Sequence, residues 1–193
     1  NNKNDDDNNN SADRGDISVN SSCSNPSAGP VLTEEDFSLF PLRDQFQFNH
    51  VKDLLERFVQ KSHGKALFVD SVEVVYNPTL QKQFDEHVAT LHKQNIALKF
   101  HGTNETAMLN ICKEGFKLPE KFGMYGKGIY FATDSSKSAQ YSQGTQKLLL
   151  CEVAIGNYWL QEKATPDLTF SQVQAHGYDS VYAPRGTKEK GGV

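Results

Sequence analysis

An almost uninterrupted apolar run at residues 147–155, KLLLCEVAI, constrains the fold of this chain more than any other stretch. A short apolar run of this kind is typical of a strand that is covered on both faces. Such a strand lies inside a sheet rather than at its edge. The sequence therefore predicts a β-sheet in which residues 147–155 run through the middle.

Other stretches predict further strands for this sheet. Residues 66–76, ALFVDSVEVVY, are rich in β-branched residues, which favour extended structure. Three shorter stretches are also predicted to be strands: residues 96–100, 128–132 and 178–183.

Helices are predicted between these strands. Apolar residues recur at helical spacing in residues 51–59. The Asn-Pro pair at 77–78 suits the cap and the first residue of a second helix. A third helix is predicted to begin after Thr103 or Asn104 and to end at Gly115. Because strands and helices do not alternate regularly, the sequence predicts an α+β fold with a mostly antiparallel sheet.

The composition divides the chain into a tail and a folded part. Residues 1–30 are rich in Asn, Asp and Ser, and contain five aspartates against Lys3 and Arg14, so they carry −3 of the net charge of −4. Since they have almost nothing to bury, we expect a disordered tail at residues 1–30 and a folded domain at residues 31–193.

The sequence also disfavours several classes of partner and site. Neither part has the basic stripe of a direct nucleic-acid binder, and no apolar run is long enough to span a membrane. The scattered cysteines do not have the spacing of a metal site, and Cys112 and Cys151 are interpreted as small core residues. His176 is interpreted as a turn residue without a partner. With no signal peptide, a nuclear or cytoplasmic location is expected.

A glycine-rich segment at residues 123–141, GMYGKGIYFATDSSKSAQY, indicates a ligand site. Three glycines within six residues precede a short apolar stretch, and a Ser-Lys-Ser group then leads to a tyrosine. This combination suits a small planar ligand that is sandwiched, hydrogen-bonded and covered.

Four motifs, taken together and in this order, resemble the catalytic domain of the poly(ADP-ribose) polymerase family. They are HGT at residues 101–103, YGKGIYFA at 125–132, SSKSAQY at 135–141 and GYDSVYAPRG at 177–186. The resemblance implies a split, mostly antiparallel β-sheet of the ADP-ribosyltransferase type. It also implies that NAD is the co-substrate, that the nicotinamide–ribose bond is cleaved, and that ADP-ribose passes to a protein acceptor.

The resemblance assigns four residues to nicotinamide. It implies that the backbone N–H and C=O of Gly102 pair with the carboxamide, to which Ser138 also donates a hydrogen bond. Tyr141 is implied to stack on the ring, and Tyr130, the second member of the family's catalytic triad, to face it from the other side.

Two further residues are assigned to the sugars. His101, the first triad member, is implied to bond a ribose hydroxyl, and Thr103 to contact the adenosine ribose. Residues 119–126 match a loop that lies over the pocket, and their glycines suit a flexible cover.

The third triad member stands on a later strand in the family, and a glutamate there supports polymer formation. This chain is expected to stop before that strand, so the domain is expected to be C-terminally incomplete and to lack the last strands of its sheet. Glu189, which is flanked by Lys188 and Lys190, is interpreted as solvated. Both a fragment of a longer enzyme and a naturally short product fit this pattern.

Two functions from different classes follow. The first is an NAD-dependent protein ADP-ribosyltransferase, and the second is an inactive module that binds NAD or ADP-ribose or only contacts proteins. A toxin-like transferase is a weaker third. We expect Gly102→Val to abolish nicotinamide binding and to leave the fold intact, and Tyr141→Ala to weaken binding less.

Overall fold

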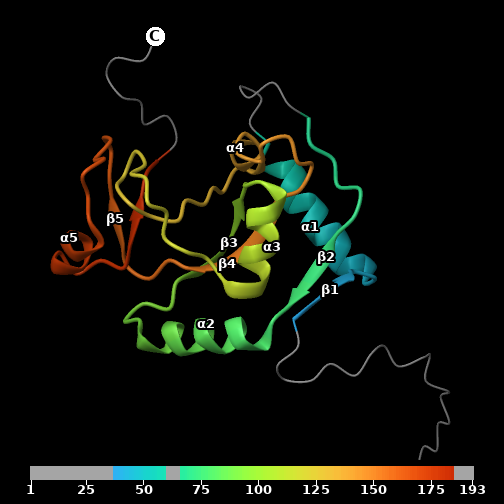
Figure 1. Ribbon diagram of the computed structural model, residues 1–193, viewed down its shortest axis with the longest axis horizontal. Helices are drawn as coiled ribbons and strands as arrows, with labels where there is room; N and C mark the ends of the chain where they lie inside the picture. Colours follow the sequence, from blue (N-terminus) through green and yellow to red (C-terminus); the bar gives the residue numbers. More distant parts are fainter. Residues whose placement is uncertain (1–36, 60–65, 185–193) are drawn as a thin grey trace, which may run out of the picture. The chain divides into compact units, whose positions relative to one another are not determined.

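The computed structural model describes residues 37–59 and 66–184 of the chain. Within them the chain forms six strands and five helices in irregular order (Figure 1). The strands are β1 (Ser38–Pro41), β2 (Glu73–Tyr76), β3 (Ile96–His101), β4 (Leu149–Ala154), β5 (Tyr158–Leu160) and β6 (Ser180–Tyr182). The helices are α1 (Gln45–Arg57), α2 (Pro78–Thr90), α3 (Glu105–Glu114), α4 (Ser135–Ala139) and α5 (Phe170–Ala175). The predicted tail at residues 1–30 and Glu189 lie outside the described residues.

The strands form three two-stranded sheets. β1 pairs with β2 and β3 with β4, both antiparallel, whereas β5 pairs with β6 in parallel. The chain passes through α5 between β5 and β6, and a helical crossover of this kind lets consecutive strands run in the same direction. The predicted α+β class with antiparallel pairing is confirmed. The parallel pair and strands β1 and β5 were not predicted.

Strand β3, rather than the apolar run at residues 147–155, is the inner strand. β4 lies in this run and pairs with β3 from Ile96 opposite Ala154 to His101 opposite Leu149. On its other edge, β3 exchanges two backbone hydrogen bonds with Ala132. Among the described residues β4 has no second neighbour, so the prediction that this run lies in the middle of a sheet is wrong. Its side chains are half-buried or exposed.

Two predicted strands are shorter in the structure. From residues 66–76 only β2 is a strand, because its partner β1 offers four residues for pairing. From residues 128–132 only Ala132 pairs, in an isolated bridge with Phe100. The prediction of a strand at residues 128–132 is therefore wrong. The carbonyl of Tyr130 bonds the side chain of His101 instead, and this bond belongs to the site described below.

The helix boundaries follow their caps. α1 begins at Gln45, earlier than predicted, because Oδ1 of Asp44 accepts a hydrogen bond from the N–H of Gln47 at 2.9 Å. Asn104, one of the two predicted caps, accepts from the N–H of Ala107 at 2.8 Å and starts α3. The predicted end of α3 at Gly115 is confirmed, with a φ of 82° that suits glycine.

Asn77 joins two helices as well as capping one. Its Oδ1 accepts from the N–H of Leu80 at 3.1 Å, as the predicted cap of α2 requires. Its Nδ2 donates to the carbonyls of Cys112 and Lys113, each at 3.0 Å, in the last turn of α3. One side chain therefore satisfies free backbone groups at the start of α2 and at the end of α3.

Small side chains fill much of the interior. Ser135 and Ser136 of α4 have no exposed surface, and Oγ of Ser135 donates to the carbonyl of Leu55 in α1 at 2.6 Å. Cys151 is half-buried, and burial raises the pKa of its thiol to about 12, so the thiol stays protonated at neutral pH. The buried apolar side chains are Phe100, Met108, Cys112 and Val173.

The helices in the described part of the chain are too short or too polar for any of them to cross a membrane.

Replacing Asn77 by alanine should destabilise the fold more than replacing Asp44. Asp44→Ala removes one exposed cap bond and should lower the free energy of unfolding by about 1 kcal/mol or less. Asn77→Ala removes a cap and leaves two carbonyls of α3 without a donor, so a loss of about 2 kcal/mol is expected. Urea unfolding of both variants measures the difference, and equal losses would show that the bonds to α3 contribute nothing.

Candidate functional site

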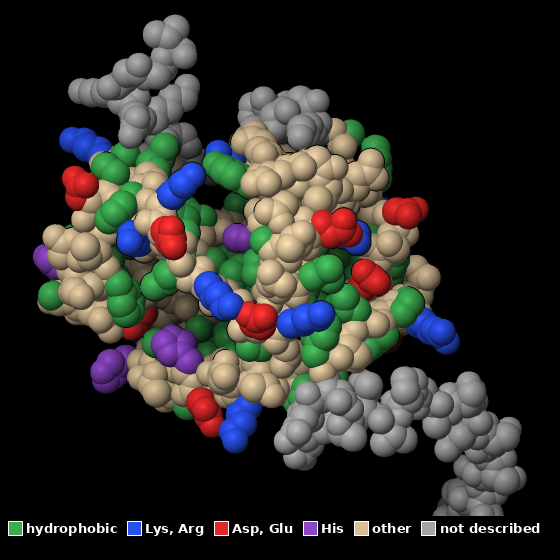
Figure 2. Space-filling model, viewed as in Figure 1, with side chains coloured by type: hydrophobic (Ala, Val, Ile, Leu, Met, Phe, Trp, Pro, Cys, Tyr) green, Lys and Arg blue, Asp and Glu red, His purple; other side chains and the backbone are tan. Residues whose placement is uncertain are grey.

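A cavity of about 710 Å³ brings together all six residues that the sequence analysis singled out. Its walls come from the end of β3, from α3, from the segment that follows α3, and from α4. Figure 2 shows hydrophobic side chains gathered around a hollow, with acidic and basic side chains interspersed over the surrounding surface. The six residues are His101, Gly102, Thr103, Tyr130, Ser138 and Tyr141.

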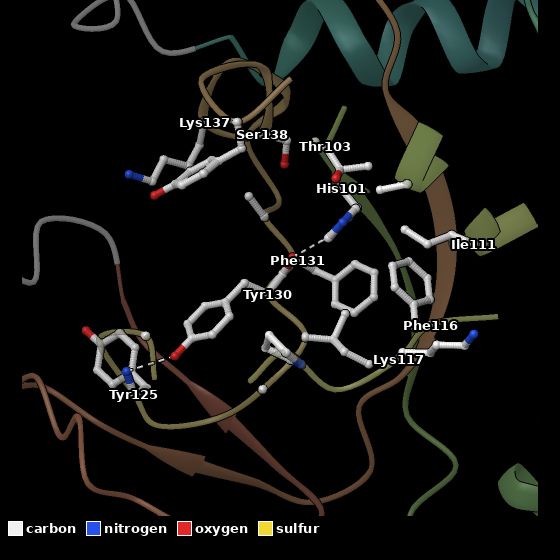
Figure 3. Close-up of a pocket in the computed structure, with 18 of the residues that line it drawn as sticks. His101, Thr103, Ile111, Phe116, Lys117, Tyr125, Tyr130, Phe131, Lys137 and Ser138 are labelled. Carbon is white, nitrogen blue, oxygen red and sulfur yellow. Dashed lines mark hydrogen bonds between the residues drawn. The ribbon is translucent and has the colours of Figure 1, made fainter. Parts of the chain in front are cut away.

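A single bridge pairs β3 with Ala132, and this pairing goes no further at the edge of the cavity. The N–H of Phe100 donates to the carbonyl of Ala132 at 2.8 Å, and the N–H of Ala132 donates back at 2.9 Å. In a continued antiparallel ladder the next bonded pair would be Gly102 with Tyr130. The carbonyl of Tyr130 instead accepts a hydrogen bond from Nδ1 of His101 at 2.9 Å (Figure 3). Within the described part of the chain, the N–H and C=O of Gly102 consequently form no hydrogen bond.

This bond also fixes which ring nitrogen of His101 is the donor. A carbonyl oxygen can only accept, so Nδ1 carries a hydrogen, and in the neutral form of the ring the lone pair is then on Nε2. Two phenylalanines hold the ring in place. Phe116 lies at 5.0 Å between ring centroids with the planes at 82°, and Phe131 lies at 5.6 Å. His101 therefore offers a fixed hydrogen-bond acceptor at the cavity wall.

Ser138 lies between the sheet and the cavity. Its side chain is 5% exposed, and Oγ donates to the carbonyl of Phe100 at 2.9 Å. That carbonyl also accepts the N–H of Ala132, so it would keep one donor if the serine hydroxyl turned away. In its present state Ser138 presents lone pairs to the cavity. To donate to a ligand, the hydroxyl must rotate away from Phe100.

Gly102 lies against the backbone of α4. A Cβ at this position would come within 1.9 Å of the carbonyl oxygen of Ser138 and 3.4 Å of the backbone nitrogen of Ser142. Such a contact is with backbone, so no side-chain rotation can relieve it. The expectation that Gly102→Val leaves the fold intact is therefore wrong. This glycine is needed for α4 to pack against the end of β3.

Tyr130 connects the cavity wall to the turn at residues 123–126. Its hydroxyl donates to the carbonyl of Gly126 at 2.8 Å and accepts from the N–H of Tyr125 at 2.9 Å (Figure 3). Burial is the main cause of a raised pKa for this phenol. The turn itself is closed by backbone bonds between Gly123 and Gly126, at 3.0 and 3.2 Å. The predicted cover thus contains a hydrogen-bonded turn.

Tyr141 presents a ring at the cavity wall. It is 57% exposed and follows α4, which ends at Ala139. Nζ of Lys137 lies 5.5 Å from the ring centroid. The ammonium group therefore interacts with one face of a ring that lines the cavity.

The sequence analysis missed the residues that shape the cavity without a polar role. Phe116 and Phe131 pack on each other at 5.2 Å as well as on His101. Phe116 directly follows the helix-ending Gly115, and an apolar residue at that point of the sequence was the available signal. Ile111 and Lys117 also line the cavity.

His176 lies outside the cavity, and the interpretation that it has no partner is wrong. Its ring stacks on Trp159 with centroids 4.4 Å apart, and its Nδ1 bonds the carbonyl of Gln172 at 2.8 Å. In the described ranges no three His, Cys, Asp or Glu side chains are grouped as a metal site would require.

Comparison with known proteins identifies sequences like this one. The sequence model of the poly(ADP-ribose) polymerase catalytic domain matches residues 45–192. Protein mono-ADP-ribosyltransferase PARP3 of Gallus gallus is 35% identical over 136 residues, which cover 68% of this chain and 24% of the relative.

Two other relatives are similar over shorter regions. Poly(ADP-ribose) polymerase 1 of Danio rerio is 28% identical over 129 residues, or 61% of this chain and 13% of the relative. Protein mono-ADP-ribosyltransferase PARP10 of Mus musculus is 33% identical over 110 residues, or 50% of this chain and 11% of the relative. The chain spans less than a quarter of the length of each of these three relatives.

Gly102 and Gly128, which line the same cavity, provide a matched pair of substitutions. Gly102→Ala should lower the free energy of unfolding by at least about 2 kcal/mol, because its Cβ meets the backbone of α4. Gly128→Ala should change it by less than about 1 kcal/mol, since a Cβ there lies 3.9 Å from the nearest atom, in the Tyr130 ring. Thermal and urea unfolding test both values. A Gly102→Ala variant as stable as the parent would contradict the close approach of α4.

Proposed function

Because the chain belongs to the poly(ADP-ribose) polymerase catalytic domain family, we propose that it binds NAD in this cavity and transfers ADP-ribose to a protein acceptor. The similar proteins are named as ADP-ribosyltransferases or poly(ADP-ribose) polymerases. NAD is the substrate in this proposal, and the nicotinamide–ribose bond is the one that breaks. The proposal rests on the polar groups at the end of β3.

The free backbone groups of Gly102 are the observation that carries the proposal. A carboxamide has N–H donors at one end and a carbonyl acceptor at the other, so it can pair with a backbone C=O and N–H together. Gly102 offers both groups at the cavity wall, without a hydrogen bond to the described residues. Gly102 is half-buried, so its N–H and C=O gain from a partner in the cavity, whether a ligand or water. The nicotinamide carboxamide has the matching pattern. The hydroxyl of Ser138, which bonds the carbonyl of Phe100, is close enough to Gly102 to serve the same carboxamide.

The aromatic walls suit the nicotinamide ring. Tyr141 can stack on one face of a flat heteroaromatic ring, and Tyr130 contributes a second ring to the cavity. The two triad residues that this chain supplies, His101 and Tyr130, are joined by the Nδ1–carbonyl bond. In this proposal Tyr130 contacts the nicotinamide ring and His101 bonds a ribose hydroxyl.

The reaction requires that the sugar be held while positive charge develops on it. Cleavage of a glycosidic bond proceeds through an oxocarbenium-like state, and fixed contacts to the sugar hydroxyls strengthen as that charge grows. In the neutral ring, the lone pair on Nε2 of His101 can accept a hydrogen bond from a ribose hydroxyl, and the two phenylalanines immobilise the imidazole that holds it. Thr103, next to Gly102 in the wall, is proposed to contact the adenosine ribose.

The proposal is tested with the full-length protein and NAD labelled separately in nicotinamide and in adenine. Nicotinamide should be released, and the adenine label should become attached to protein. His101→Ala should slow both processes by about a hundredfold, since it removes an oriented group at the reacting sugar. Its folding is checked by circular dichroism. Binding of NAD without release would favour the inactive binding module, and no binding at all would favour a domain that only contacts proteins.

The stacking role of Tyr141 gives a separate prediction. Tyr141→Ala should weaken nicotinamide binding by about 1 kcal/mol, or about fivefold, because it removes an aromatic face but leaves the polar contacts. Tyr141→Phe keeps the face and should bind as the parent does. Calorimetry with nicotinamide compares the two variants, and equal affinities for Tyr141→Ala and the parent would remove stacking on this ring from the proposal.

A further inference from the structure

We propose that the hydroxyl of Tyr130 is a latch that holds the turn at residues 123–126 against the cavity wall and thereby slows the escape of a bound ligand. This inference rests on the proposed function, because it concerns the same cavity. It makes Tyr130 a positioning residue through its hydroxyl, separate from any contact that its ring makes with the ligand.

The hydroxyl is occupied by the turn. Its one hydrogen is donated to the carbonyl of Gly126, and it accepts the N–H of Tyr125, so both bonds end on the backbone of the same turn. Their lengths, 2.8 and 2.9 Å, are those of well-formed hydrogen bonds. A phenol that donates its hydrogen in this way is not available to give a proton to a reacting group.

The turn is shaped to receive the tyrosine. Two reciprocal backbone hydrogen bonds between Gly123 and Gly126 close it, and its central residues, Met124 and Tyr125, do not have positive φ values. Gly123 packs directly on the phenol, where a Cβ would lie 2.5 Å from the hydroxyl oxygen. Gly126 has a φ of 84°, a conformation that suits glycine. The turn and the tyrosine therefore fit closely together.

The other side of the turn is held independently. The carbonyl of Met124 accepts from the N–H of Thr165 at 2.9 Å, and a Cβ at Gly126 would lie 1.9 Å from the carbonyl oxygen of Leu168. The turn is thus attached to residues 165–168 on one side and to Tyr130 on the other. Among the described residues, the bonds of the Tyr130 hydroxyl are the side-chain hydrogen bonds that tie this turn to the wall of the cavity.

The turn forms part of the cavity, so its position affects the ligand. Gly123, Met124 and Tyr125 all line the cavity, together with residues at the end of β3. If the hydroxyl bonds are lost, the turn keeps its attachment to Thr165 but can move away from the phenol ring. A ligand in the cavity would then be less well covered and would dissociate faster.

Hydrogen exchange of the ligand-free protein tests the latch directly. In Tyr130→Phe the ring stays, but the N–H of Tyr125 loses its acceptor, so its exchange should become about tenfold faster. The N–H of Ala132, which bonds the carbonyl of Phe100, should exchange at the parent rate. Unchanged exchange at Tyr125 would overturn the proposal, as would an equal acceleration at Ala132, which would mean general loosening.

Nicotinamide dissociation gives the second measurement. Tyr130→Phe should raise the dissociation rate about fivefold. Asp44→Ala, which removes an exposed cap bond of α1 and does not line the cavity, controls for lost stability. This variant should release nicotinamide at the parent rate. A parental rate in Tyr130→Phe would overturn the latch, whereas failure of the parent to bind nicotinamide would overturn the proposed function and leave the exchange result to decide on the hydroxyl bonds.

Discussion

The hydrogen bond from Nδ1 of His101 to the carbonyl of Tyr130 determines where the sheet ends and the cavity begins. At Phe100 and Ala132 the two backbones pair as antiparallel strands do, in a single bridge. One residue later a side chain takes the acceptor that the ladder would have used. Three consequences follow from this single bond. The backbone of Gly102 stays free, the histidine ring is oriented, and Tyr130 leaves the sheet with its phenol directed at the turn of residues 123–126.

The small residues near this bond allow the backbone of α4 to approach β3. Gly102 and the buried serines of α4 leave no side chain between the two segments, so a backbone carbonyl contacts a backbone Cα. The polar atoms that are enclosed in this way find partners, as Ser135 does with the carbonyl of Leu55 and Ser138 with that of Phe100. Little apolar surface is buried at this contact, because the buried side chains are serines. Close packing and satisfied hydrogen bonds stabilise it instead.

Features that depend on residues close together in the sequence could be predicted. The caps at Asn77 and Asn104 and the end of α3 at Gly115 depend on neighbouring residues, and all three were predictable. The six site residues were found through motifs, and the structure places them around one cavity. Their individual roles stay predictions.

Features that depend on distant segments could not be predicted. The bond between His101 and Tyr130, the contact of Gly102 with α4, and the choice of β3 as inner strand each join segments far apart in the sequence. Alternation and apolar runs specify an extended segment but not its neighbours, so residues 128–132 looked like a strand although one residue pairs. The parallel β5–β6 pair also depends on a crossover that the pattern of its short strands does not reveal.

Trp159 has a consequence for optical studies of this protein. It is the one tryptophan of the chain, and its indole stacks on His176 at 4.4 Å and on Tyr178 at 5.6 Å. It does not line the cavity. Its emission should therefore respond to the integrity of the unit formed by β5, α5 and β6. A change in tryptophan emission on adding a ligand would indicate that binding in the cavity alters this unit. An unchanged emission would be compatible with a cavity that the ligand fully occupies.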